Sequence, residues 1–194
     1  MRSRFRTPFQ LLGAFVLFLS PHRRVEEILV VFTDAEIDRD QTVARLVDIL
    51  NLLGQVDERS LALVKRYVRH IAIWKGHYTA YDSLGGIQFS SSWLADSSDL
   101  YLASVLVHEA THLRIYGFGI NYAADKRTRI EHRCVKQQVA FLRRVPLGET
   151  YAAELEVAVE TPWWTDQAHR HDAERLVSEH NLPRWLRPLL RRRS

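Results

Sequence analysis

The stretch from Val105 to Gly117, VLVHEATHLRIYG, constrains the fold more than any other part of the chain. It places His108, Glu109 and His112 in a run that is otherwise almost wholly apolar. Residues four apart lie one above the other on an α-helix, with about 5–6 Å between their Cβ atoms. Burying two imidazoles and a carboxylate is costly unless they are paired or bound to a metal. The stretch therefore predicts a buried helix whose polar side chains share a partner.

The chain has 194 residues, of which 46% are hydrophobic and 26% charged, and these values are typical of one globular domain. Its formal net charge of +4 comes largely from arginines near the two ends, in MRSRFR and RWLRPLLRRRS, whereas the centre is close to neutral. This distribution argues against a nucleic-acid partner. The single cysteine, Cys134, cannot form an internal disulfide and gives no information about the redox compartment.

Residues 1–24 combine a basic start with an apolar run from Phe9 to Leu19. That run is too short to cross about 30 Å of hydrocarbon, which takes about 20 helical residues. Three interpretations remain: a buried or membrane-surface helix, a secretion signal, or a short membrane anchor. Cytoplasmic, membrane-associated and exported locations all stay open. In a membrane-associated protein this segment would make the peripheral contact with the membrane. We expect a single domain over residues 25–190 and a basic tail over 191–194.

Hydrophobic periodicity predicts a helical hairpin ahead of the motif. The first helix ends near Gly54, and the second runs from near Asp57, placed to cap it, to Gly76. Their apolar faces carry Val43, Leu46, Leu50 and Leu53, and then Leu61, Val64, Val68 and Ile71. The apolar run 28–32 fits a strand or the end of a helix equally well.

Sheet structure is expected to be limited to HYTAYDSLGGIQFSS, residues 77–91, which is typical of a small β-hairpin. Ser97, Ser98 and Asp99 are N-cap candidates for the motif helix, and Gly117 is its expected end. Further helices are predicted over 122–144, 150–160 and 166–180. The fold class is therefore α+β, mainly α-helical.

Histidines at this spacing are typical zinc ligands. His108 and His112 can aim their imidazoles at one point, about 2.0–2.1 Å from a shared Zn²⁺ ion. Glu109 points about 100° away around the helix, so it can reach a water molecule beside the metal. In the H-E-x-x-H motif that carboxylate takes the proton of the water as the water attacks a carbonyl. We predict a zinc cofactor with Glu109 as general base; the alternative is two core histidines with Glu109 as their salt-bridge partner.

A catalytic zinc needs a third protein ligand and an open position. No histidine follows His112 at the metzincin spacing. Glu131 lies nineteen positions after His112, on a predicted helix whose apolar residues would pack against the motif helix. Glu131 is therefore the predicted third ligand, and His132 and Asp125 are its alternatives.

The HEATH sequence, followed by Glu131 on a second helix, resembles the gluzincin branch of zinc metallopeptidases. More narrowly, LVHEATHLR and RIEHRCVKQQVAFLRR resemble small bacterial zincin-like proteins with a HEATH motif. The resemblance covers residues 86 to 145 and implies a compact zincin-like domain. It also implies that an edge strand, here Ile87, Gln88, Phe89 and Ser90, binds the substrate main chain by strand addition.

Family members also use a histidine or tyrosine to stabilise the oxyanion. His169, His171, Tyr151 and Tyr116 are available for that role. The resemblance thus predicts zinc-dependent hydrolysis of a peptide bond in a peptide or protein substrate. The alternative is a non-catalytic zinc-binding regulatory or scaffold protein, whose metal is closed by a fourth ligand such as His132 or Asp125.

Overall fold

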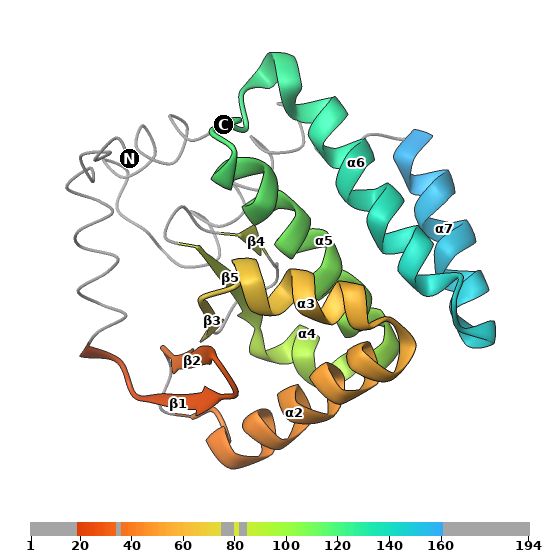
Figure 1. The fold of residues 1–194 in the computed structure, drawn as a ribbon. Coiled ribbons are helices and arrows are strands. Elements are labelled where there is room, and N and C mark those ends of the chain that lie inside the picture. The colour runs from red at the N-terminus through yellow and green to blue at the C-terminus, as the bar shows by residue number, and fades with distance from the viewer. Residues whose placement is uncertain (1–18, 34–35, 75–79, 82–84, 161–194) are drawn as a thin grey trace, which may run out of the picture.

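The computed structural model describes residues 19–33, 36–74, 80–81 and 85–160 (Figure 1). Within this part the chain is mainly helical with one five-stranded sheet, which confirms the predicted α+β class. None of the helices described combines the length and the apolar character that a membrane crossing requires. The segment 1–18, the helix predicted over 166–180 and the tail 191–194 lie outside the described residues.

The sheet has the strand order β1-β2-β3-β5-β4. Its strands are β1 (His22–Val25), β2 (Ile28–Phe32), β3 (His70–Trp74), β4 (Ala80–Tyr81) and β5 (Gly86–Ser90). The central strands β2, β3 and β5 are parallel, and both outer strands are antiparallel to their neighbours. The apolar run 28–32, for which the sequence allowed a strand or the end of a helix, is a strand. The expectation that sheet is limited to residues 77–91 is therefore wrong.

The first two helices form the predicted hairpin but with different bounds. Helix α2 (Arg39–Val56) continues past Gly54, and α3 (Glu58–Tyr67) begins after Asp57, whose side chain accepts the N–H of Arg59. The cap at Asp57 was predicted correctly. The predicted continuation of this helix to Gly76 is wrong, because residues 70–74 form β3.

Helix α5 (Asp99–Gly117) carries the HEATH motif and begins and ends where the sequence predicted. Ser98 is its N-cap and accepts the N–H of Tyr101 at 3.2 Å. Every residue from Leu102 to Leu113 is buried. A helix buried on all sides explains why the motif lies in an almost continuous apolar run.

Helix α5 lies between two groups of helices (Figure 1). Helices α2 and α3 pack on one side, and α6 (Ala124–Leu142) packs along the other. After a short 3-10 helix (Pro146–Gly148), α7 (Glu149–Glu160) packs against α6. The pairing of α5 with α6 brings the two segments with candidate ligands together.

The short helix α4 (Ser91–Asp96), which the sequence did not predict, connects β5 to α5. Arg45 of α2 holds this junction. Its guanidinium lies 2.9 Å from Asp99 Oδ1 and donates to the main-chain carbonyls of Leu94, Ala95 and Ser97. These contacts fix the start of α5 relative to α2.

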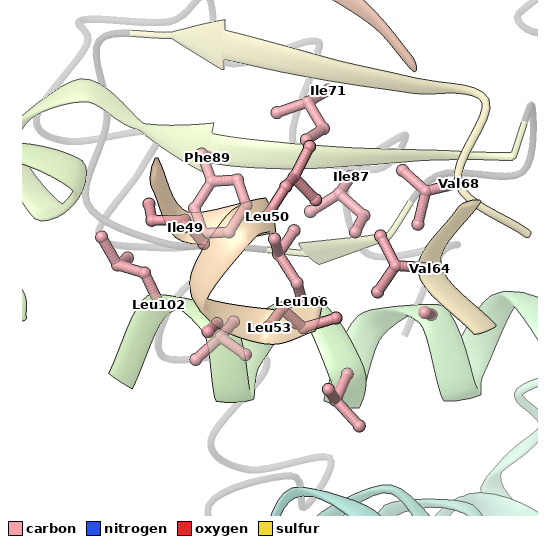
Figure 2. Packing of buried hydrophobic residues seen from close by; sticks show 14 of the residues in the cluster. Ile49, Leu50, Leu53, Val64, Val68, Ile71, Ile87, Phe89, Leu102 and Leu106 are labelled. Carbon is pink, nitrogen blue, oxygen red and sulfur yellow. The ribbon is translucent and has the colours of Figure 1, made fainter. Parts of the chain in front are cut away.

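The core fills the space between the sheet and α5 (Figure 2). It joins residues of β3 and β5 to α2, α3 and α5, among them Ile71, Ile87, Phe89, Leu50, Leu53, Val64, Leu102 and Leu106. Gly86 is required where β5 meets β3, because a Cβ at this position would overlap the imidazole of His70, its register partner. A well-packed core on this side of α5 keeps its other side against α6.

Candidate metal centre

Three predicted ligands meet between α5 and α6. The Nε2 atoms of His108 and His112 are 3.1 Å apart. Glu131 Oε2 lies 3.4 Å from His108 Nε2, and Glu131 Oε1 lies 3.4 Å from His112 Nε2. Ligand atoms around a tetrahedral zinc with bonds of about 2.0–2.1 Å are separated by about 3.3–3.4 Å. The two distances involve different oxygens of Glu131, so one of its oxygens would have to move toward both imidazoles for the three side chains to bind one zinc ion.

Glu131 is held in the charge state that a ligand needs. Burial alone raises the pKa of its carboxyl, but the close contacts with His108 and His112 outweigh burial and hold the pKa well below its usual range. For His108 burial acts in the opposite direction and lowers the pKa. The contact with Glu131 and the charge of Glu109 outweigh burial, so that the pKa of His108 is raised overall. Metal binding would replace protons on the imidazoles with a cation that the same carboxylate stabilises.

His108 has a second buried contact on its other ring nitrogen. Its Nδ1 lies 3.0 Å from Gln138 Oε1, and Gln138 Nε2 donates to Ser104 Oγ at 3.0 Å. Ser104 Oγ in turn donates to the main-chain carbonyl of Tyr101 at 2.6 Å. Sequence reasoning missed Gln138, although it lies seven residues after Glu131, two turns along the same face of the helix.

Glu109 lies beside the cluster but is not part of it. The residue is only 7% exposed, and its carboxylate forms no hydrogen bond or ion pair in the described part of the chain. The histidines are paired with Glu131 instead. The alternative in which Glu109 is their salt-bridge partner is therefore not the arrangement in the structure.

The two alternatives to Glu131 are turned away from the histidines. His132 and Asp125 are both exposed on α6, whereas Glu131 is only 3% exposed. Since these residues share one helix, its rotation about its own axis selects Glu131.

Cys134 is a further candidate ligand that the sequence reasoning did not consider. Its sulfur and the imidazole nitrogens of His108 and His112 lie within 4.8 Å of one another, and the residue is fully buried. Burial, with the charges of Glu131 and Glu109, raises the pKa of the thiol far above its usual range. Cys134 is therefore a thiol without a metal, and it could bind one only by losing its proton.

Tyr122 is a second residue that sequence reasoning missed. Its hydroxyl donates to Glu131 Oε1, and its ring meets the ring of His112 edge-on, with 5.7 Å between the centroids. The guanidinium of Arg127, a buried residue, lies 5.2 Å from the centroid of the Tyr122 ring. Tyr122 thus brings a hydroxyl donor to the edge of the cluster.

Of the four residues expected to stabilise an oxyanion, Tyr151 lies away from the cluster. The Tyr151 hydroxyl lies 3.1 Å from Ser98 Oγ, at the start of α5. Ser98 is about 15 Å along the helix axis from His108. Tyr116 is half-buried one turn beyond His112, and His169 and His171 lie outside the described residues.

The predicted substrate strand does not lie at the edge of the sheet. β5 runs between β3 and β4, with Ile87 opposite both Ile71 and Tyr81, and Gln88 opposite both Ala72 and Ala80. The side chains of Ile87 and Phe89 are in the core, and Ser90 caps α4. β5 is therefore not an edge strand at Ile87 and Gln88, where β4 pairs with it. The reason is that β4 forms its hydrogen bonds with the side of β5 to which a substrate strand would have to add. Substrate binding by Phe89 and Ser90 stays a prediction.

Comparison with protein-family models, with curated proteins and with solved structures finds no match for this chain. The chemistry of the site must therefore be argued from its own residues. Two imidazoles and a carboxylate at tetrahedral spacing suit Zn²⁺.

Proposed function

We propose that this chain is a zinc-dependent hydrolase that cleaves peptide bonds, with His108, His112 and Glu131 as the zinc ligands. The choice of a peptide bond rests on the resemblance of HEATH and Glu131 to the gluzincin pattern. Zinc at this position would polarise a substrate carbonyl and lower the pKa of a water molecule.

The observation that carries the proposal is the state of Glu109. The Glu109 side chain is buried for the most part and has no donor from the described residues, but its oxygens are not among the fully buried unpaired atoms, so they can contact a water molecule. Glu109 follows His108 directly, so its carboxylate is close to the ligands without being taken up by them. In the proposed reaction Glu109 accepts a proton from the attacking water and passes it to the leaving amine.

Tyr122 and Glu131 support this chemistry. With a metal bound the two imidazoles would be neutral, and Glu131 would offset part of the charge of the metal. The Tyr122 hydroxyl donates its one hydrogen to Glu131 Oε1 and so supports the ionised state of this ligand.

The test is the Glu109→Gln substitution, which keeps the size of the side chain and removes the proton acceptor. We expect zinc content and melting temperature close to wild type, and cleavage of a fluorogenic peptide library reduced by about 10²–10⁴-fold. Glu154→Gln, the same change at an exposed position of α7, is the control and should keep full activity. Loss of zinc or of folding in Glu109→Gln would instead make Glu109 a structural residue.

A second candidate is a non-catalytic protein whose zinc stabilises a regulatory or scaffold domain. Two observations favour it: the three ligands are only 3–5% exposed, and Cys134 lies where a fourth ligand could close the site. Structural zinc is normally bound by four protein ligands, and catalytic zinc by three.

Cobalt substitution separates these two functions. A thiolate ligand gives cobalt a sulfur-to-metal charge-transfer absorption in the near ultraviolet. The hydrolase proposal expects no such band in wild-type protein, and expects Cys134→Ser to keep both metal and activity. Two results together would establish the closed site. The absorption band would be present in cobalt-substituted wild-type protein and absent in Cys134→Ser, and zinc-loaded wild-type protein would cleave no library peptide.

A further inference from the structure

We infer that Gln138 is a positioning residue: it keeps a proton on Nδ1 of His108 and so presents Nε2 as the atom that binds the metal. The inference rests on the metal site proposed above. It assigns a role to the buried polar chain that joins Tyr101, Ser104, Gln138 and His108.

The donor and the acceptor of each hydrogen bond in this series follow from the carbonyl of Tyr101 at its end. The main-chain carbonyl of Tyr101 can only accept, so the Ser104 hydroxyl donates its one hydrogen to it. The Ser104 oxygen must then accept, and the amide nitrogen of Gln138 is its donor. This contact fixes which end of the Gln138 amide points to Ser104.

The amide oxygen of Gln138 consequently faces His108 Nδ1 at 3.0 Å. A carbonyl oxygen only accepts, so Nδ1 must carry the hydrogen. In the neutral ring the lone pair then lies on Nε2. Nε2 is also the atom that lies 3.1 Å from His112 Nε2 and 3.4 Å from Glu131 Oε2.

Burial makes this series of hydrogen bonds selective for the Nδ1–H tautomer of His108. Ser104, His108 and Gln138 are 0%, 5% and 3% exposed, so bulk water is poorly placed to replace any of these contacts. Ser104 and His108 lie on α5, whereas Gln138 lies on α6. The chain therefore orients one ligand and also ties together the two helices that carry all three.

The first experiment needs no variant and no metal. Long-range proton–nitrogen NMR spectra of nitrogen-15-labelled wild-type protein, metal-free and in alkaline buffer, identify the protonated nitrogen of His108. We expect the Nδ1–H tautomer. A ring that carries its proton on Nε2 would overturn the inference, whether or not the protein proves to be a hydrolase.

The second experiment measures zinc affinity by competition with a chromogenic chelator. Gln138→Met removes the acceptor at nearly constant volume and should weaken zinc binding by about 10–100-fold, the usual effect of removing such a support. Gln138→Glu keeps an acceptor for His108 Nδ1 but loses the donor to Ser104 Oγ, and it should bind zinc more tightly than Gln138→Met does. Gln137→Met, the same change one residue earlier at a half-buried position, is the control and should also match wild type.

These outcomes separate a positioning role from simple packing. Wild-type affinity in Gln138→Met, or an equal loss in Gln138→Met and Gln138→Glu, would overturn the inference. Failure of wild-type protein to bind zinc would overturn the proposed function, while the NMR experiment would still decide the role of Gln138.

Discussion

The Glu131→Gln substitution tests the metal centre directly, because it removes a shared negative charge at almost constant volume. Each carboxylate oxygen of Glu131 lies 3.4 Å from one imidazole, and its side chain is only 4% exposed. The low pKa of this carboxyl keeps it ionised at neutral pH. An amide has only one oxygen and no charge, and its nitrogen cannot serve as a ligand.

The size of the effect follows from the energy of zinc binding. Structural zinc sites bind with about 10–16 kcal/mol, which is about 2.5–4 kcal/mol for each of four ligands. Since about 1.4 kcal/mol corresponds to a factor of ten, losing one ligand should raise the zinc Kd by about 10²–10³-fold. His108 and His112 alone would then hold the ion.

Competition with a chromogenic chelator measures this Kd in metal-free protein titrated with zinc. Asp125→Asn and His132→Asn are controls on the same helix, and both should bind zinc as wild type does because these residues are exposed. Near wild-type affinity in Glu131→Gln, together with a large loss in either control, would refute Glu131 as the third ligand.

Three further predictions concern stability, measured as the free energy of unfolding in urea. Arg45→Met should lower it by about 1.5–3 kcal/mol, because the half-buried guanidinium loses Asp99 and the carbonyls at the end of α4; an unchanged midpoint would show that the junction is held by packing alone. Gly86→Ala should lower it by about 1–3 kcal/mol, because the new methyl overlaps the His70 ring; wild-type stability would mean that His70 can move aside. In metal-free protein, the stability advantage of wild type over Glu131→Gln should be full near neutral pH and shrink below about pH 4.3, the unfolded-state pKa, since the folded carboxyl has a lowered pKa and resists protonation; a difference independent of pH would contradict this pairing.

The sequence by itself determined the features that depend on local interactions. The cap at Ser98, the end at Gly117 and the spacing of His108 and His112 are all set within α5. A capping side chain acts within three residues, and helical spacing acts within one turn, so both can be recognised without the rest of the fold.

The strands show where local pattern misleads. Ile71 continues the helical spacing of Val64 and Val68, yet it lies in β3 and packs on the same core as they do. Parallel strands buried on both faces lack the alternation that identifies a strand. The position of β5 inside the sheet likewise depends on its pairing with β4, which the sequence of β5 does not encode.

The proposed metal centre depends on both local pattern and tertiary structure. Periodicity limits the third ligand to a few residues of α6, but the rotation of α6 against α5 selects Glu131 over His132 and Asp125. The same rotation brings Gln138 to His108, while the course of the chain into α6 brings Tyr122 to Glu131. These contacts join residues that lie 9 to 30 positions apart, and only the packing of two whole helices fixes such a register.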